Sequence, residues 1–191
     1  MNTAFVALGA NIGDPTATVL AAFAALANLP ESRVARCSSL YRTAPVGLRN
    51  QPDFINAVAV LETTLPPESL LDALLDLEAR FGRVRRDRNG PRTLDLDLLL
   101  YDDIELELPR LTLPHPRLHL RAFVLYPLAE VAPGITLPRR GKLAAWLPAV
   151  ANQGIARLRT ALDHPSAARC MLDTSFFPNR HRCPLKASPA A

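Results

Sequence analysis

The sequence predicts an α+β sandwich in which helices pack, mainly on one face, against a single antiparallel β-sheet. Segments with strand and helix patterns follow one another in the order βαββαβ, and the apolar runs are short and bounded by turn residues. The chain has 191 residues, of which 49% are hydrophobic, so it can bury one sizeable core. We therefore expect one domain over residues 1–163 and a flexible C-terminal extension of low apolar content over residues 164–191.

The first strand and the first helix are predicted at the N-terminal end. Residues 4–8 form a continuous apolar run, which is typical of a buried strand, and residues 9–13 contain glycines and predict the turn that follows it. Asp14 and Pro15 predict a helix start, because aspartate caps a first turn and proline fits the first helical position. The apolar residues of this helix recur on one face and are Val19, Phe23 and Leu26.

Two further strands are predicted on either side of a long loop. Residues 33–41 alternate imperfectly between apolar and polar side chains, and residues 42–52 carry the prolines and the glycine of a loop. Residues 54–63 form a clearer strand, with Phe54 and Asn56 on one face. These two side chains can stack on and hydrogen-bond a flat heterocycle, although ordinary core packing explains the pattern equally well.

A second helix is predicted from Pro66 to about Gly82. Its apolar stripe consists of Leu70, Leu71, Leu74, Leu75 and Phe81. Glu78 falls on this stripe, where a charged side chain needs a partner or a function.

A run of arginines follows the second helix. Because the arginine side chain ends in a planar fork that suits bidentate contacts with phosphate, the run is a candidate anion-binding loop. A charge run is also typical of a solvated surface, but its position directly before a strand that carries two aspartates favours the anion-binding interpretation. The run consists of Arg80, Arg83, Arg85, Arg86, Arg88 and Arg92.

The most informative strand is predicted over residues 94–101. Asp95 and Asp97 point to the same face of it, because successive strand residues alternate sides. Two like charges on an apolar strand are costly unless a positive charge lies between them, and oxygen ligands suit Mg²⁺ bound together with a phosphate-bearing substrate. The alternative is that the aspartates lie at a sheet edge and are merely solvated.

The sequence from residue 111 onwards predicts one extended segment followed by helices. Residues 111–116 are extended around His115, and residues 120–131 predict a helix with Arg121 and Phe123 near its start. Two weaker apolar stripes follow, first Leu143, Trp146, Leu147 and Val150, and then Ile155, Leu158 and Leu162.

The charge and the cysteines restrict the possible partners and surroundings. The net charge is +4, but +3 of it lies beyond Asp163, so the body is close to neutral and a nucleic-acid partner is not expected. No apolar run reaches the length of a membrane span, and no leader-like segment opens the chain, so we expect a cytoplasmic protein without a membrane partner. Cys37, Cys170 and Cys183 are widely spaced and are expected to be free thiols.

Four blocks of sequence resemble the family of 6-hydroxymethyl-7,8-dihydropterin pyrophosphokinases. They are residues 38–47, 51–56, 82–85 and 90–97, the last reading Gly-Pro-Arg-Thr-Leu-Asp-Leu-Asp, and they occur in the family's order. The resemblance runs from about residue 3 to residue 148. It implies a ferredoxin-like fold and a folate-biosynthesis enzyme that moves the terminal pyrophosphate of ATP to the pterin hydroxymethyl group, releases AMP and uses two Mg²⁺ ions. This in-line transfer needs no covalent enzyme intermediate.

The resemblance also assigns roles to individual residues. It implies that Asp95 and Asp97 hold the metal ions and that Arg83 and Arg92 contact the phosphates. The expected ATP-site residues are Glu78, Arg85, Leu98, Arg110, Leu111, Thr112, His115 and Arg121. The expected pterin-site residues are Phe54 and Phe123, which stack on the two faces of the ring, Asn56, which bonds its polar edge, and Thr43, Pro45 and Val46, which line the pocket.

Two alternatives from other functional classes remain at this point. A two-metal nucleotidyltransferase on a similar sheet releases pyrophosphate rather than AMP. A non-catalytic nucleic-acid-binding module needs exposed aromatic residues and a basic face, which the nearly neutral body and the two strand aspartates oppose. The expected partners are therefore ATP and 6-hydroxymethyl-7,8-dihydropterin, bound by a monomer.

Overall fold

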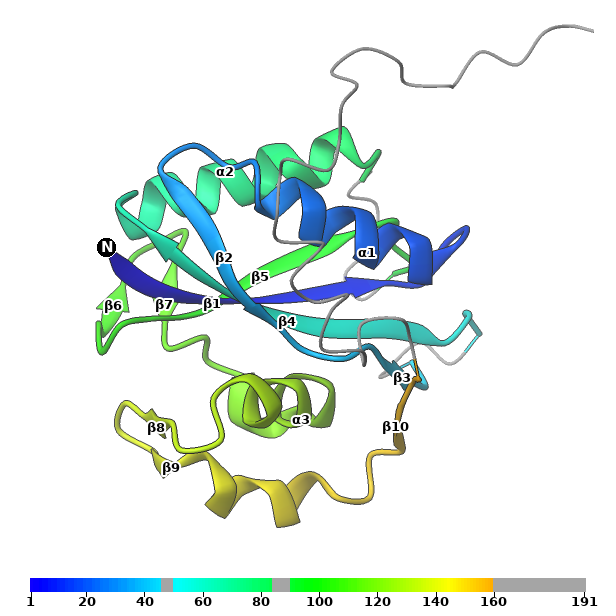
Figure 1. The fold of residues 1–191 in the computed structure, drawn as a ribbon. Coiled ribbons are helices and arrows are strands. Elements are labelled where there is room, and N and C mark those ends of the chain that lie inside the picture. Colours follow the sequence, from blue (N-terminus) through cyan, green and yellow to red (C-terminus); the bar gives the residue numbers. More distant parts are fainter. Residues whose placement is uncertain (46–49, 84–89, 160–191) are drawn as a thin grey trace, which may run out of the picture.

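The computed structural model describes residues 1–45, 50–83 and 90–159. Its strands are β1 (Asn2–Ala10), β2 (Ser32–Cys37), β3 (Tyr41–Thr43), β4 (Phe54–Thr63), β5 (Asp95–Tyr101), β6 (Leu106–Glu107), β7 (Thr112–Leu113), β8 (Thr136–Leu137), β9 (Gly141–Lys142) and β10 (Ile155–Arg157). Its helices are α1 (Pro15–Leu26), α2 (Pro67–Arg80) and α3 (Ala122–Val131), with the 3₁₀ helices η1 (Leu118–Leu120) and η2 (Leu143–Val150). Figure 1 shows these elements in chain order.

The main sheet confirms the predicted α+β fold. Its strands run in the order β10-β3-β4-β1-β5, with β2 paired to β4 as well, and all of these pairings are antiparallel. The elements β1, α1, β2 with β3, β4, α2 and β5 form the predicted βαββαβ core. The short strands β6 with β7 and β8 with β9 form two separate pairs.

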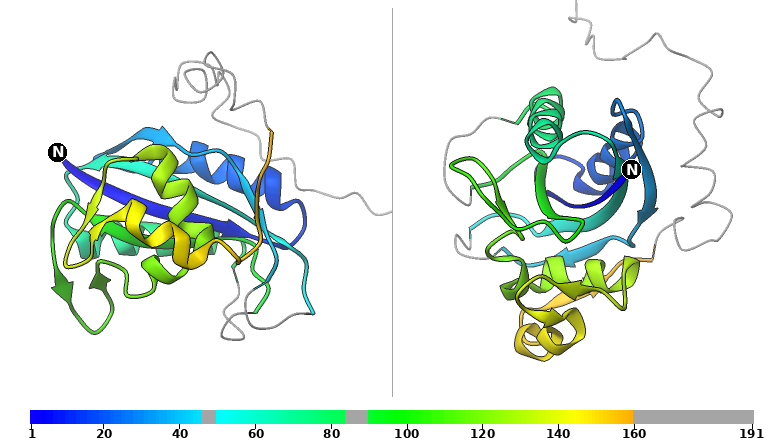
Figure 2. Two further views of the ribbon diagram at one scale, coloured as in Figure 1. Left: turned by 90° about the horizontal axis from the view of Figure 1, so that it is seen from below. Right: turned by 90° about the vertical axis from the view of Figure 1, so that its left-hand side faces the viewer.

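Helices cover both faces of the sheet, whereas the sequence suggested mainly one. α1 and α2 lie on one face, and α3 and η2 lie on the other (Figures 1 and 2). The reason is that β1 and β4 are apolar on both sides. Ala4 and Val6 pack into the core beneath α1 and α2, while Phe5 and Ala7 pack into a second core against α3.

The two long helices begin and end close to the predicted positions. The Asp14 side chain accepts a hydrogen bond from Ala17 N at 3.0 Å and caps α1. After α2 the chain turns at Gly82, whose φ of 74° favours glycine. The fully buried residues of α2 are Leu70, Leu74, Leu77 and Glu78, whereas the predicted stripe members Leu71 and Leu75 are only partly buried.

Three segments differ from the sequence prediction. The expected strand over residues 33–41 is two strands, because Ser38 interrupts it and accepts a side-chain hydrogen bond from Val58 N at 2.9 Å. Gly9 belongs to β1 and not to a turn, since it pairs with residues on both neighbouring strands. Residues 155–157 form a strand instead of a helical stripe, because β3 offers them unpaired backbone groups at the sheet edge.

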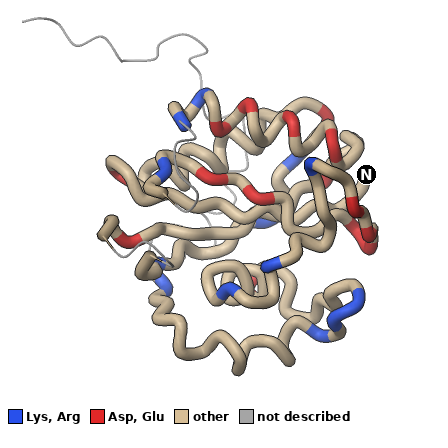
Figure 3. The backbone as a smooth tube through the Cα atoms, turned by 180° about the vertical axis from the view of Figure 1, so that it is seen from behind, with Lys and Arg blue, Asp and Glu red and all other residues tan. Residues whose placement is uncertain are grey.

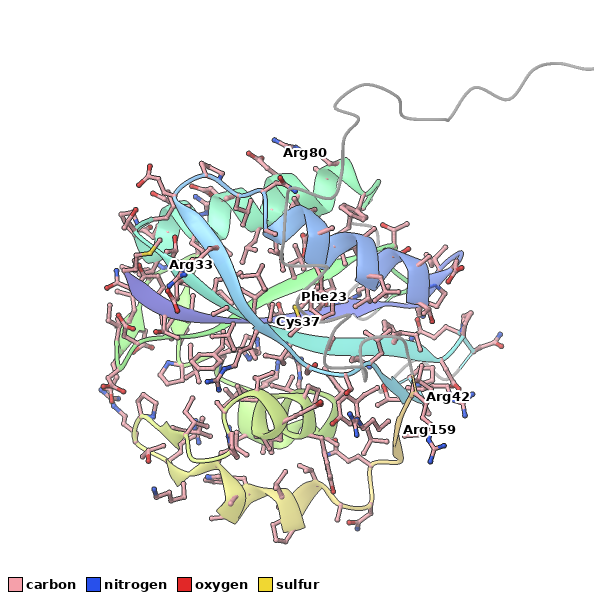
Figure 4. The ribbon with its side chains drawn as sticks, in the orientation of Figure 1. Phe23, Arg33, Cys37, Arg42, Arg80 and Arg159 are labelled. Carbon is pink, nitrogen blue, oxygen red and sulfur yellow. The ribbon has the colours of Figure 1, made fainter. Side chains whose placement is uncertain are left out.

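Cys37, the cysteine within the described ranges, is a partly buried free thiol. Cys37 packs beside Phe23 between the sheet and α1 (Figure 4), and burial raises the pKa of its thiol to about 12. Cys170, Cys183 and the predicted extension over residues 164–191 lie outside the described residues. Among the helices of the described ranges, none has both the length and the apolar character needed to cross a membrane.

Candidate active site

A cavity of about 1450 Å³ opens where β1, β4 and β5 face the start of α3. Pockets for one drug-sized ligand have volumes of roughly 300–1,000 Å³, so this cavity has room for two substrates. Pro45 is described but does not line it, and Val46 and Arg85 lie outside the described residues. The cavity is lined by the other site residues predicted from the sequence: Thr43, Phe54, Asn56, Glu78, Arg83, Arg92, Asp95, Asp97, Leu98, Arg110, Leu111, Thr112, His115, Arg121 and Phe123.

Gly9 lines the cavity between the side chains of Asn56 and Asp95. It pairs with Asn56 of β4 on one side and with Asp95 of β5 on the other. A Cβ atom at position 9 would lie 3.2 Å from Asn56 Oδ1 and 4.0 Å from Asp95 Cβ, so any side chain here would fill the space between them. Gly9 was expected in a turn and not at the site, although strand alternation from Phe5 and Ala7 puts it on this face.

The two aspartates are surrounded by arginines. Asp95 Oδ1 lies 2.5 Å from Arg83 Nη1, and its Oδ2 is ion-paired with Arg92. Asp97 Oδ2 lies 3.7 Å from Arg121 Nη1. β5 ends the sheet, as the solvated alternative assumed, but the Asp95 side chain is only 18% exposed and its charge is compensated. The positive charge that two strand aspartates require therefore comes, in this structure, from arginines.

Asp97 is less well compensated than Asp95. Desolvation raises the pKa of the Asp97 carboxyl, and the neighbouring Asp95 raises it further, against the opposing effect of Arg121. The side chain is 39% exposed, and this exposed part faces the cavity, which Asp97 lines. An additional cation beside Asp97 is thus electrostatically favoured.

Glu78 supports the aspartate strand from behind. It is buried, its Oε1 accepts a hydrogen bond from Leu96 N at 2.7 Å, and it is ion-paired with Arg83. Because β5 is the last strand of the sheet, this backbone N–H has no strand beyond it and depends on the carboxylate. The charged residue on the apolar stripe of α2 therefore fixes β5 through the Leu96 N–H and orients Arg83.

Asn11 connects the loops around the cavity and was not singled out by the sequence analysis. Its Oδ1 accepts a hydrogen bond from Arg92 N at 2.8 Å, and its backbone N donates to Arg92 O at 3.1 Å. Its Nδ2 donates to Gln51 Oε1 at 3.1 Å and to Pro52 O at 3.2 Å. One buried amide thus joins the segment before β5 to the segment before β4. No sequence pattern signals it, because all of its partners are distant in the chain.

The other end of the cavity carries the aromatic and amide side chains. Phe54 comes from the start of β4, and Phe123 comes from the first turn of α3. Asn56 Nδ2 donates a hydrogen bond to Thr43 Oγ1 at 2.9 Å, which fixes the orientation of the buried amide. The Arg121 guanidinium lies 5.3 Å from the centre of the Phe123 ring, a cation–π contact made by the same guanidinium that approaches Asp97.

His115 and Arg110 occupy the side of the cavity near α2 and β7. Desolvation, together with Arg121 and Arg117, lowers the pKa of the His115 imidazole to about 4. Its Nδ1 accepts a hydrogen bond from Arg117 N at 3.2 Å, so the neutral ring carries its proton on Nε2 and can donate it to a ligand. Arg110 is exposed and pairs with Asp72 of α2 at 2.6 Å.

His115 is expected to make the protein sensitive to mild acid. Its folded pKa of about 4 lies below the ordinary value of 6.5, so between these pH values the unfolded chain binds a proton that the folded chain does not. Stability present above pH 6.5 is lost as the pH falls towards 4, by on the order of 1–3 kcal/mol. His115→Gln removes this dependence. Urea unfolding without Mg²⁺ or nucleotide at pH 7.0, 5.5 and 4.5 measures it, and equal slopes for both proteins would contradict it.

The donor atoms of the cavity suit Mg²⁺ that is shared with phosphate. Within the described ranges no cluster of three or more His, Cys, Asp or Glu side chains could hold a metal by itself. Mg²⁺ is commonly bound by one or two carboxylates together with substrate phosphates, and Asp95 and Asp97 supply two carboxylates on one face. Among the described residues, the buried Thr93 Oγ1 beside them has no hydrogen-bond partner. The site therefore has unused capacity for a polar ligand.

The charge on the side of the molecule that Figure 3 shows is mixed and not uniformly basic. Figure 3 shows both Lys and Arg positions and Asp and Glu positions on this side, with acidic residues lying along α2. Arg80, at the end of α2, is exposed and points away from the sheet (Figure 4), unlike Arg83 and Arg92. The predicted arginine run thus divides, with two members turned into the cavity, while Arg85, Arg86 and Arg88 lie outside the described residues.

Comparison with known proteins gives one consistent result. The family model described as 7,8-dihydro-6-hydroxymethylpterin-pyrophosphokinase (HPPK) matches residues 5–133. A Pseudomonas aeruginosa protein named 2-amino-4-hydroxy-6-hydroxymethyldihydropteridine pyrophosphokinase is 49% identical over 154 residues, which cover 81% of this chain and 95% of the relative. A protein of the same name from Synechocystis is 50% identical over 139 residues, covering 73% and 71%.

The fold is similar to that of solved structures as well. A crystal structure of Plasmodium falciparum HPPK-DHPS A437G with pteroate aligns with a TM-score of 0.63 at 14% identity. The alignment covers 83% of this chain and 47% of that one, so the chain spans less than half of its length. At this identity the likeness concerns the fold alone.

Proposed function

Since the chain belongs to the 7,8-dihydro-6-hydroxymethylpterin-pyrophosphokinase family, we propose that the cavity on the α3 side of its sheet is the active site. The chain is a pyrophosphokinase of folate biosynthesis, which transfers pyrophosphate from ATP to 6-hydroxymethyl-7,8-dihydropterin and releases AMP. The nucleotidyltransferase and the nucleic-acid-binding module are thereby set aside. The observation that carries the proposal is the division of one cavity into an aromatic end and an aspartate–arginine end, with Gly9 between them.

The pterin is proposed to bind at the aromatic end. Phe54 and Phe123 supply rings from two different elements, and Asn56 supplies an amide whose orientation Thr43 fixes. A flat heterocycle with a polar edge needs this combination, because stacking holds its faces while the amide distinguishes its hydrogen-bond pattern. Pro45 and Val46 are proposed from the family resemblance alone as further pocket residues.

ATP is proposed to bind at the aspartate–arginine end. Arg83 and Arg92 present planar forks that suit phosphate oxygens, and the neutral His115 offers an Nε2–H donor. Glu78, Leu98, Arg110, Thr112 and Arg121 complete the described part of this proposed site, and Arg85 belongs to it by resemblance.

Asp95 and Asp97 are the residues proposed to hold Mg²⁺, with two ions as the family resemblance implies. When bound, Mg²⁺ neutralises phosphate charge and lowers the pKa of a coordinated hydroxyl. The fit rests on the raised pKa of Asp97 and on the shared face of the two carboxylates. Arg83 and Arg92 pair with Asp95 here. With Mg²⁺ at the aspartates, both guanidiniums would be available to phosphate oxygens, so the same arginines could compensate either the carboxylate or the substrate.

The chemistry follows from positioning and charge. The pterin hydroxyl oxygen attacks the β-phosphorus of ATP and gives up its proton to solvent, the bond from this phosphorus to the α-β bridging oxygen breaks, and AMP leaves with that oxygen. No covalent enzyme intermediate is needed. Because Gly9 leaves the space between Asn56 and Asp95 open, the hydroxymethyl group of a pterin held at one end can reach phosphates held at the other. Arg83 and Arg92 stabilise the charge of the transferred group.

The catalytic unit is proposed to comprise residues 1–163, with residues 164–191 as an extension. The composition of the extension supports this, since it contains little apolar sequence. We also propose that the enzyme acts as a monomer in the cytoplasm, where ATP is available.

Loss of either aromatic ring is expected to weaken pterin binding. Stacking contributes about 0.5–1.5 kcal/mol beyond area burial, so Phe54→Ala and Phe123→Ala should each raise the pterin Kd by about tenfold or more. Phe81→Ala is the matched control, because this ring is partly buried at the end of α2 and does not line the cavity. Fluorescence titration with the pterin measures the effect. Unchanged affinity in both site variants would remove the stacking assignment and relocate the pterin.

A further inference from the structure

Gln153 holds the backbone on both sides of Arg121. Its Oε1 accepts a hydrogen bond from Ala122 N at 2.8 Å, and its Nε2 donates to Leu120 O at 2.8 Å. One amide side chain therefore binds the residue before the arginine and the residue after it. Gln153 lies 31 and 33 positions along the chain from these partners, and beyond the residues 5–133 that the family model matches.

The bond to Ala122 replaces a missing helix cap. The first N–H groups of a helix have no partner within it, and a side chain at the N-cap position usually satisfies one of them. Arg121 is the N-cap residue of α3, but its side chain makes no capping bond. The guanidinium instead lies beside Asp97 and over the Phe123 ring. Gln153, which lies in a distant segment, thus caps α3, and the Arg121 side chain can extend into the cavity.

The same segment is fixed at its other end to the opposite wall of the cavity. Gly154, with φ of 61°, turns the chain directly into β10, which pairs with β3 in the register Ile155 with Thr43. Thr43 is the partner of the Asn56 amide. Figure 1 shows β10 descending from β3 towards η2, and Figure 4 shows Arg42 of β3 and Arg159 after β10 at the same corner.

We infer that Gln153 is a positioning residue of the pterin site: by bracketing residues 120–122 it sets the direction of Arg121 and of the Phe123 ring. The segment that carries Gln153 continues into β10, which pairs with β3. It therefore fixes the position of the Phe123 ring relative to the side of the pocket that carries the Asn56 amide. The inference rests on the proposed pterin site. It adds a residue that touches neither substrate and acts only through its neighbours.

Gln153→Ala tests the inference, with Asn152→Ala as the matched control, because Asn152 is the adjacent exposed amide. The expected result is a pterin Kd raised about three- to tenfold, the loss that one or two ordinary hydrogen bonds produce, with a melting temperature close to that of the control. Hydrogen exchange of the Ala122 amide, followed by NMR, should accelerate. Gln153→Glu keeps the acceptor and should restore part of the affinity.

The outcomes separate this inference from the proposed function. If Phe123→Ala weakens pterin binding while Gln153→Ala leaves it unchanged, the bracket does not position the ring and the inference is wrong. If neither variant changes the affinity although Ala122 exchange accelerates, the proposed pterin site is wrong and the inference falls with it. A lowered melting temperature with unchanged affinity would make Gln153 a purely structural residue.

Discussion

Asp97→Asn is expected to fold normally and to lose turnover by on the order of 10²–10³-fold, a loss comparable to that found when one preorganised oxyanion-hole donor is removed. A neutral amide binds Mg²⁺ weakly, so the phosphate charge stays uncompensated while the β-phosphorus is attacked. Desolvation and Asp95 raise the pKa of the Asp97 carboxyl, so its ionised form destabilises the folded state. Asn at this position should therefore leave the free energy of unfolding unchanged or slightly increased.

Asp95→Asn should lose activity to a similar extent but should also destabilise the protein. Its carboxylate is the shared partner of Arg83 and Arg92, and removal leaves both guanidiniums without this compensation in a poorly exposed site. Asp103→Asn is the control, since Asp103 is exposed just beyond β5. Steady-state AMP formation and urea unfolding of the three variants measure the effects. Near-normal turnover in Asp97→Asn at limiting Mg²⁺ would contradict the carboxylate metal site.

Arg92→Ala is expected to lower turnover by about 100-fold or more, because a charge directed at the transferred group is lost. Arg80→Ala should have no effect. Both residues belong to the same arginine-rich stretch, but Arg92 pairs with Asp95 inside the cavity, whereas Arg80 points away from the body. Single-turnover kinetics at saturating ATP separate the chemical step from binding. Equal losses in the two variants would mean that the stretch acts only through its general positive charge.

Much of the fold could be predicted from local patterns. The Asp14-Pro15 start of α1 and the bounds of β4 follow from capping and alternation, which are properties of neighbouring residues. The second helical layer and β10 were harder, because they depend on what the sheet offers. β10 is a strand because β3 presents an unpaired edge. The pattern of apolar residues over 155–162 does not indicate this pairing.

The site could be predicted where residue type and spacing carry the chemistry. Asp95 and Asp97 share a face, and the need for positive charge beside them follows from electrostatics, although the structure supplies arginines there. Asn11 and Gln153 could not be found in this way. Each joins segments far apart in the chain through ordinary amide hydrogen bonds, so only the three-dimensional arrangement reveals them.

The fate of the phosphates of ATP is the most direct test of the proposed active site. The enzyme is mixed with Mg²⁺, 6-hydroxymethyl-7,8-dihydropterin and ATP labelled in its γ-phosphate, and the products are separated and counted, with Asp97→Asn beside the wild type. The expected result is one AMP for each labelled pterin pyrophosphate, with both products formed on the order of 10²–10³-fold more slowly in the variant although pterin still binds. Label recovered as free pyrophosphate, or equal product from the variant, would contradict pyrophosphate transfer at this pair of aspartates.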